Sequence, residues 1–321
     1  MSDKPLLSFV IPCYRSAQTI GGVVTELRNT LISRPEFQYE IILVNDGSPD
    51  NVAGVIAALC REHPEIVFVN LSRNFGQHSA LMAGFAEVRG EVVICLDDDG
   101  QTPADECFSL IDKVYEGYDL VFAEYPTRKQ SPFRNLGSRF NAACNHYFFG
   151  QPKDLKANSY YACKRFVVDN ALHYPNPFPY ITGLLFQSVS RYTNVLVNHR
   201  PRLQGESGYS LKKLVSLWAS GVTAFSIKPL RLASYLGWGV AGFGFLFAFL
   251  IIIQKLLNPD MQAGWASTIA VMMSLGGVII ALIGILGEYI GRIYLSINRC
   301  PQYVIRNVID NRRNDAEEEK P

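Results

Sequence analysis

The sequence predicts an α/β domain with a mostly parallel sheet, followed by interfacial helices and two C-terminal transmembrane helices. Up to about Arg231, short apolar runs typical of buried strands alternate with segments of helical spacing. Such alternation indicates βαβ units and a parallel sheet. Beyond that point the chain contains two long runs without a charged residue, each long enough to cross a bilayer.

Four strands and three helices are expected in the first part of the chain. The strand-like runs are LSFVIPCY, which we expect Pro12 to end, then YEIILVN, IVFVNLS and EVVICLDDD. The helix-like segments are TIGGVVTELRNTLIS, NVAGVIAALCREH and GQHSALMAGFAEVRG, and Gly90 is expected to stop the last one. The first helix has its apolar residues at helical spacing on one face: Ile20, Val23, Val24, Leu27 and Leu31.

Polar clusters follow each of the four predicted strands. They are Pro12–Tyr14, Asp46–Ser48, Arg73–Gly76 and Asp97–Asp99. Ligands of parallel sheets bind at the carboxyl ends of the strands, so these clusters predict a site at one edge of the sheet. No Gly-x-Gly-x-x-Gly follows the first strand and no Gly-Lys-Ser/Thr occurs, which disfavours a dinucleotide oxidoreductase and a P-loop NTPase.

Composition excludes several other classes. The net charge of +1 and the lack of a long basic block give no reason to expect nucleic-acid binding. The seven cysteines are scattered without a Cys-x-x-Cys, which suits a reducing compartment and disfavours a disulfide framework or a zinc site. The first apolar run is too short for a signal peptide, so the domain is expected in the cytoplasm.

The two uncharged runs span residues 233–253 and 266–287. A pair of buried helices in a soluble core is the disfavoured alternative, because uncharged runs of this length are unusual there. Basic residues flank the outer ends of the pair, so the positive-inside rule places both termini in the cytoplasm and the connecting loop outside. These residues are Lys212, Lys213, Lys228 and Arg231 before the pair, and Arg292, Arg299, Arg306, Arg312 and Arg313 after it.

We therefore expect four parts in the chain. Residues 1–210 form the cytoplasmic domain, 211–231 form interfacial amphipathic helices, 232–290 form the two spans and 291–321 form a cytoplasmic tail. The interfacial segment mixes basic residues with Leu, Trp and Phe, as helices on a membrane surface do. Glycines in the first span, such as Gly239 and Gly242, would permit close helix approach and a homo-oligomer.

The motifs in this order resemble family 2 glycosyltransferases with the GT-A fold. They are FVIPCYRS, EIILVNDGSPD, LSRNFGQHSALMAGF and CLDDDGQTP. The later RLQGESGYSLKKL, SIKPLRL and GEYIGRIY resemble the membrane-anchored polyprenyl-phosphate glycosyltransferases. That group includes bactoprenol glucosyltransferases, undecaprenyl-phosphate formamido-arabinose transferases and dolichol-phosphate mannose synthases. The resemblance runs from about Leu7 to about Tyr303.

The resemblance implies a divalent cation, Mg²⁺ or Mn²⁺, held by Asp97, Asp99 and Gln101 against the donor diphosphate. Hard cations prefer such oxygen ligands together with substrate phosphates. Alternation along a strand end would turn Asp98 to the other side. A solvated acidic turn is the alternative interpretation.

The nucleotide-sugar donor is expected to contact further residues of the same edge. By resemblance, Asp46 would recognise the base or ribose, Pro12 and Tyr14 would form a wall, and Arg73 and Gln77 would lie nearby. A structural role is expected for His78, because oxygen ligands already supply the metal site.

The negative charges of the diphosphate leaving group and of the acceptor phosphate would be stabilised by positively charged side chains. Arg128, Arg134 and Arg202 are candidates for the diphosphate, since guanidinium matches phosphate geometry. For each of them a solvated surface arginine is the alternative. Arg202, Ser207 and Tyr209 are the candidates for the acceptor phosphate.

Asp154 is a candidate base. The sequence departs from the family near it, because Asn158 and Ser159 stand where many members carry an aspartate.

The expected reaction is the metal-dependent, inverting transfer of a sugar from a nucleotide sugar, UDP-linked, to undecaprenyl phosphate at the bacterial inner membrane. A phosphate monoester has a second pKa of about 6, so the acceptor needs positioning more than a strong base. One alternative is a processive polysaccharide synthase, which usually carries Gln-x-x-Arg-Trp. Here three residues separate Gln187 from Arg191. A catalytically inactive membrane scaffold is the other alternative, and the intact acidic motifs disfavour it.

Overall fold

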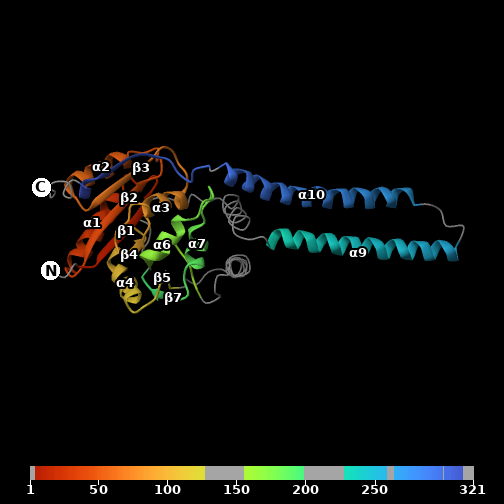
Figure 1. Cartoon of the computed structure of the whole chain (residues 1–321), viewed down its shortest axis with the longest axis horizontal. Coiled ribbons are helices and arrows are strands. Elements are labelled where there is room, and N and C mark those ends of the chain that lie inside the picture. Colours follow the sequence, from red (N-terminus) through yellow and green to blue (C-terminus); the bar gives the residue numbers. More distant parts are fainter. Residues whose placement is uncertain (1–3, 127–154, 199–227, 259–263, 299, 314–321) are drawn as a thin grey trace. The chain divides into compact units, whose positions relative to one another are not determined.

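The computed structural model describes residues 4–126, 155–198, 228–258, 264–298 and 300–313 (Figure 1). The chain divides into two compact units, of which the first comprises residues 1–209 with 299–321 and the second residues 210–298. Most of the segment 211–231, where interfacial helices are expected, lies outside the described residues.

The first unit is built on one mixed sheet, which the described residues form with eight strands in the order β7-β5-β6-β4-β1-β2-β3-β8. Only β6 and β8 run against the other strands. The fold-class prediction of a mostly parallel α/β sheet is therefore confirmed. The strands are β1 (Leu6–Cys13), β2 (Gln38–Asn45), β3 (Ile66–Leu71), β4 (Val92–Cys95), β5 (Leu120–Glu124), β6 (Tyr161–Lys164), β7 (Tyr192–Leu196) and β8 (Ile305–Asp310).

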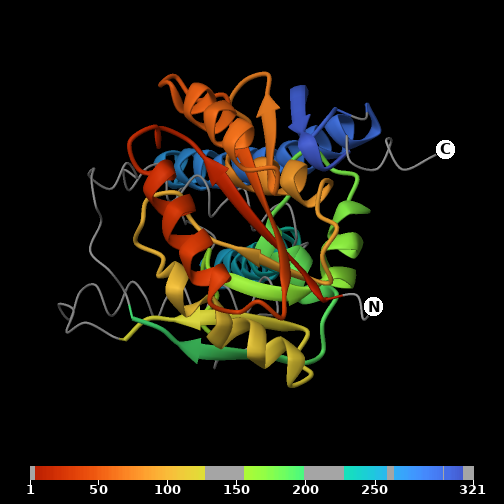
Figure 2. The same cartoon turned by 90° about the vertical axis from the view of Figure 1, so that its left-hand side faces the viewer.

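Helices cover both faces of the sheet (Figure 2). One face packs its buried side chains, Phe9 among them, against α1, α2 and α4. The other face carries α3, on which Gly84 allows a close approach. A Cβ at Gly84 would lie 2.5 Å from Cγ1 of Val10 in β1. The helices of this unit are α1 (Ile20–Ile32), α2 (Val52–Glu62), α3 (Gln77–Phe85), α4 (Cys107–Tyr115) after the short η1 (Ala104–Glu106), α6 (Arg165–Leu172) and α7 (Ile181–Gln187).

Element boundaries differ from the expected ones at three places. β1 continues through Pro12 to Cys13, while β4 ends at Cys95, before the acidic cluster. Pairing of β1 with β4 ends at Val10 and Cys95, and the Leu96 amide makes the last hydrogen bond, to the Val10 carbonyl. Pro12 lies two residues beyond this last pair, so the N–H that it lacks is not needed for pairing with β4. Helix α3 ends at Phe85, five residues before Gly90.

The described end of the chain forms the edge strand β8 and the short η2 (Asn311–Arg313), where the sequence had suggested only a tail. β8 pairs antiparallel with β3. The segment ahead of it is also fixed to the first unit, because the Gln302 side chain donates to the carbonyls of Tyr174 and Asn176 at 2.6 and 2.9 Å.

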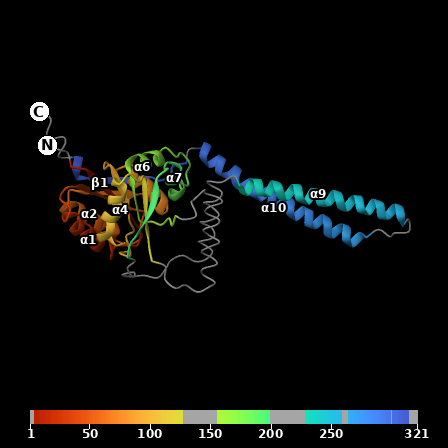
Figure 3. The ribbon, with the colours of Figure 1, turned by 90° about the horizontal axis from the view of Figure 1, so that it is seen from below.

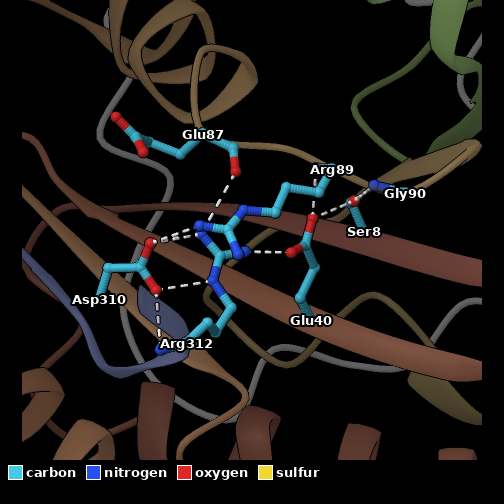
Figure 4. A network of polar contacts seen from close by, with 7 residues as sticks. All are labelled: Ser8, Glu40, Glu87, Arg89, Gly90, Asp310 and Arg312. Atoms are coloured by element: carbon cyan, nitrogen blue, oxygen red, sulfur yellow. Dashed lines mark hydrogen bonds and ion pairs between the residues drawn. The ribbon is translucent and has the colours of Figure 1, made fainter. Parts of the chain in front are cut away.

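A buried charge network fastens this C-terminal segment to the sheet (Figure 4). Glu40 of β2 is 2% exposed, and its carboxylate accepts hydrogen bonds from the Ser8 hydroxyl at 2.5 Å, the Arg89 amide at 2.6 Å and the Arg312 guanidinium. Arg312 also donates to both oxygens of Asp310 at 2.7 and 2.9 Å. Burial acts to raise the pKa of Asp310, but these hydrogen bonds hold it below its ordinary value.

The second unit is a pair of long helices lying side by side, α9 (Lys228–Leu257) and α10 (Trp265–Ile297) (Figure 3). Both extend beyond the uncharged runs that predicted them. By length and composition both can cross a membrane, and large apolar side chains on them are exposed, such as Trp238 at 79%. Arg292 pairs with Glu288 one turn earlier, near the end of α10. These features indicate a membrane protein.

Candidate active site

The predicted edge of the sheet gathers the loops that follow β1, β2, β3 and β4. After β1 the chain turns at Arg15, which has a φ of 59°. The Arg15 amide donates to the Ser48 hydroxyl at 2.8 Å, and Ser48 in turn donates to Asp50 at 2.5 Å. Tyr14 is 42% exposed next to this turn. The loops after the two neighbouring strands β1 and β2 are thus joined by side-chain hydrogen bonds.

Asp46 organises the loop after β3. It is 3% exposed, and its two carboxylate oxygens accept from the amides of Phe75 and Gly76 at 2.7 and 2.9 Å. Burial raises the pKa of Asp46, and the two amide hydrogen bonds partly offset that rise. Asp46 therefore positions the loop that carries Arg73, a role that its place in the sequence did not reveal.

Gly47 lets that loop pass directly over the turn after β2. Its φ is +56°, and a Cβ there would lie 2.2 Å from the carbonyl carbon of Arg73. No side chain fits at this distance, so a glycine is required. Arg73 itself is exposed, and its guanidinium lies 4.7 Å from the centre of the Phe75 ring.

Asp97 lies two residues beyond the end of β4 and is contacted from two sides. The Gln77 side chain, at the start of α3, donates to Oδ1 at 3.1 Å. The Ser159 hydroxyl, just ahead of β6, donates to Oδ2. The structure thus brings Gln77 and Ser159 to Asp97, and neither contact had been predicted.

Asp98 is directed to a different neighbour. Its carboxylate accepts from the Tyr14 amide at 2.9 Å, and its carbonyl accepts from the Thr19 hydroxyl at 2.7 Å. Burial raises the pKa of Asp98 to about 6, and the charges of Asp97 and Asp99 add to the rise. Asp98 therefore ties the end of β4 to the loop after β1. Strand alternation is not the cause, because β4 has already ended at Cys95.

Asp99 and Gln101 lie in the turn that follows. The backbone amide of Gln101 donates to Asp99 Oδ1 at 3.0 Å across Gly100, which has a φ of 73°. In the described part of the chain no three His, Cys, Asp or Glu side chains group as a metal site. Two carboxylates and an amide oxygen do fit a cation that completes its coordination with substrate phosphates and water, as Mg²⁺ commonly does.

His78 follows Gln77 in α3, and its ring is packed inside the protein rather than directed to the candidate metal ligands. Its ring packs edge-on against Tyr180, with centroids 5.5 Å apart. Its Nδ1 is buried and has no hydrogen-bond partner among the described residues. Burial lowers the pKa of His78 to about 4, so the ring is neutral at physiological pH.

The cationic candidates Arg128, Arg134 and Arg202 lie outside the described residues, as do Asp154, Ser207 and Tyr209. The described candidates all lie at the carboxyl edge of β1 to β4. Sequence reasoning missed Ser159 and Tyr160, whose positions are set by the antiparallel strand β6. The one available signal was that Asn158 and Ser159 stand where an aspartate was expected.

The fold is that of an α/β protein whose candidate site lies at the carboxyl edge of a mostly parallel sheet, and comparison with known proteins identifies its family. The model of glycosyl transferase family 2 matches residues 8–173, and that of the GtrB C-terminal hairpin matches residues 228–293. The chain belongs to glycosyltransferase family 2 and is a glycosyltransferase, which confirms the resemblance.

Among its relatives is the undecaprenyl-phosphate 4-deoxy-4-formamido-L-arabinose transferase of Yersinia enterocolitica, 36% identical over 98% of this chain and 97% of that protein. The uncharacterized glycosyltransferase YkcC of Bacillus subtilis is 32% identical over 98% of each. Glucosyl-3-phosphoglycerate synthase from Mycobacterium tuberculosis, solved with UDP, shares the fold with a TM-score of 0.51 and 18% identity over 69% of this chain and 79% of that one.

Proposed function

We propose that this glycosyltransferase moves a sugar from a nucleotide sugar, UDP-linked, to undecaprenyl phosphate, with a divalent cation and with inversion at the anomeric carbon. The observation that carries the proposal is the pair of carboxylates Asp97 and Asp99 beyond the end of β4. Asp97 accepts a hydrogen bond from Gln77 at the start of α3, and Asp98 between the two accepts one from the Tyr14 amide in the loop after β1. Relatives named as undecaprenyl-phosphate transferases, aligned over nearly the full chain, support the acceptor.

Asp97, Asp99 and Gln101 would hold Mg²⁺ or Mn²⁺. When bound, the cation would offset the repulsion between the carboxylates and neutralise charge on the leaving diphosphate. The hydrogen bonds that Asp97 accepts from Gln77 and Ser159 would orient it for that purpose.

The donor would lie along the same edge. Pro12 and Tyr14 would flank the nucleotide, and the loop that Asp46 fixes would bring Arg73 and Gln77 to it. Because both carboxylate oxygens of Asp46 already accept amide hydrogen bonds, contact of Asp46 with the base or ribose would be through remaining lone pairs. Arg128, Arg134 and Arg202 stay the proposed contacts of the diphosphate.

In the reaction, an acceptor phosphate oxygen forms a bond to the anomeric carbon while the bond from that carbon to the diphosphate oxygen breaks. The electron pair of the broken bond leaves with the nucleoside diphosphate. The acceptor is already anionic at pH 7, so no strong base is needed. Arg202, Ser207 and Tyr209 would bind the acceptor phosphate, and Asp154 is the proposed auxiliary base.

The site would work at the cytoplasmic face of the bacterial inner membrane, where a lipid phosphate is accessible and basic residues next to the spans would attract its head group. Both chain ends would be cytoplasmic. The product, a polyprenyl-phosphate sugar, would serve the modification of a cell-envelope glycan.

The test is a transfer assay on membranes that contain the full-length chain, with undecaprenyl phosphate and a panel of labelled nucleotide sugars. We expect one donor to be used, and we expect Asp99→Asn to lower the rate by on the order of 100-fold or more, because a cation contributes several kcal/mol. Asp98→Asn is the matched control. It keeps an oxygen that can accept from the Tyr14 amide, so it should retain most of the activity.

Undiminished transfer by Asp99→Asn, or in excess EDTA, would refute the metal-dependent site. Failure of every nucleotide sugar in the panel with undecaprenyl phosphate would refute the acceptor assignment.

A further inference from the structure

We propose that Ser159 and Gln77 are positioning residues that hold the Asp97 carboxylate in the orientation in which it receives the cation. The inference rests on the proposed function, because it assumes a cation at Asp97 and Asp99. Ser159 lies in the neighbourhood in which an aspartate was expected.

The two residues bind Asp97 from opposite elements. The Gln77 amide donates to Oδ1 and the Ser159 hydroxyl donates to Oδ2. Both donors are neutral, so they orient the carboxylate without cancelling its charge. Each carboxylate oxygen has two lone pairs, which leaves acceptor capacity for a cation.

Ser159 belongs to a short segment that is itself firmly anchored. Asn158 donates to the Ala123 carbonyl at the end of β5 and accepts from the Tyr160 amide at 2.9 Å. The Ala123 amide donates to the Tyr160 carbonyl at 2.9 Å. These hydrogen bonds fix the backbone on both sides of Ser159, so its hydroxyl starts from a defined position next to Asp97.

The same segment holds both ends of the acidic loop. Tyr160 is fully buried, and its hydroxyl donates to the Pro103 carbonyl at 3.1 Å. Ser159 thus binds the first residue of the loop 97–103 and Tyr160 binds the last. The loop that carries Asp99 and Gln101 is therefore held by the segment Asn158–Tyr160 at both of its limits.

Gln77 is anchored from the other side of the site. It follows Gly76, whose amide donates to the buried Asp46, and it precedes His78, whose ring packs on Tyr180. The start of α3 is therefore fixed, and the Gln77 amide presents Asp97 with a donor of defined position.

Partners of this kind set metal affinity through the ligand they orient, and losing one typically costs 10–100-fold. The experiment measures Mn²⁺ binding to the full-length protein in detergent by electron paramagnetic resonance, with UDP present and without turnover. We expect Ser159→Ala and Gln77→Ala each to weaken Mn²⁺ binding about 10-fold or more. Ser159→Thr, which keeps the hydroxyl, should bind near the wild-type level.

Ser188→Ala is the matched control, because its hydroxyl bonds to the Leu184 carbonyl at the end of α7. Thermal unfolding of each variant separates a loss of positioning from a loss of folding. If Ser159→Ala does not fold, the Gln77→Ala variant, at an exposed position, provides the test. Wild-type affinity in Ser159→Ala and Gln77→Ala would overturn the inference and leave the proposed function standing. A wild-type protein that binds no Mn²⁺ with UDP would overturn both.

Discussion

At the scale of single residues, three adjacent carboxylates have three different neighbours. Asp97 is bound by Gln77 and Ser159, whereas Asp98 turns to the Tyr14 amide and Asp99 closes a turn with Gln101. The cluster therefore combines a structural tie with two ligands of a proposed cation. Burial raises the pKa of Asp98, and the charges of Asp97 and Asp99 add to the rise.

His78 makes the folded protein sensitive to acid. The unfolded chain takes up a proton at His78 near pH 6.5, whereas burial lowers the pKa in the folded protein to about 4. The neutral ring therefore makes its full contribution to the free energy of unfolding above pH 6.5, and this contribution is lost as the pH falls toward 4. We expect this loss to be about 1.4 kcal/mol per pH unit within that window.

The measurement is the free energy of unfolding of the full-length protein in detergent, followed between pH 7 and pH 4. His78→Phe keeps an aromatic ring against Tyr180 and should remove most of this slope. His173→Gln is the control at an exposed histidine and should leave the slope unchanged. Parallel curves for the wild type and His78→Phe would show that His78 is not the titrating group.

At the scale of elements, the loop after β3 passes so closely over Gly47 that no Cβ fits there, and this close packing positions the loop at the site. Gly47→Ala would force the backbone at Arg73 to move and would place an alanine at a φ of +56°. We expect a loss of stability of at least roughly 2 kcal/mol, and weaker donor binding because the displaced loop carries Arg73 and leads into Gln77.

Thermal unfolding and UDP binding check this prediction. Gly22→Ala in α1 is the control, because nothing lies within 4 Å of the Cβ it would add and a helical alanine is favourable. A Gly47→Ala protein with the melting temperature of the wild type would contradict the assumed rigidity of the loop.

The sequence predicted the elements best where periodicity is strong. All five apolar residues expected on one face of α1, from Ile20 to Leu31, are buried. It failed at element ends, because the extension of β1 through Pro12 depends on where β4 stops pairing. Ser159 was also missed as a contact of Asp97, since the two are 62 residues apart and meet only through the sheet order β4-β6.

At the scale of the whole molecule, the pair Glu40 and Arg312 joins segments 272 residues apart in the sequence, which no local pattern could reveal. Removing one partner of a buried ion pair typically costs about 3–5 kcal/mol, because the other charge stays buried and unpaired. We therefore expect Arg312→Leu to lower the stability of the first unit by roughly that amount.

The double variant Glu40→Gln with Arg312→Leu should recover part of this loss, because no uncompensated charge remains at position 40 and Asp310 keeps its ion pair with Arg89. Thermal unfolding of the full-length single and double variants checks the prediction. Arg306→Leu, at an exposed position of β8, is the control for loss of a positive charge in the same C-terminal segment. Equal melting temperatures for Arg312→Leu and the wild type would contradict it.

The place of β8 near the end of the described chain also determines when the sheet can be completed during synthesis. The ribosome makes β1 to β7 first, then α9 and α10, and only afterwards the strand that covers the edge of β3 and the arginine that neutralises Glu40. Until then β3 is an open edge with unpaired backbone groups. A nascent chain can therefore finish its eight-stranded sheet only after its two apolar helices have been translated.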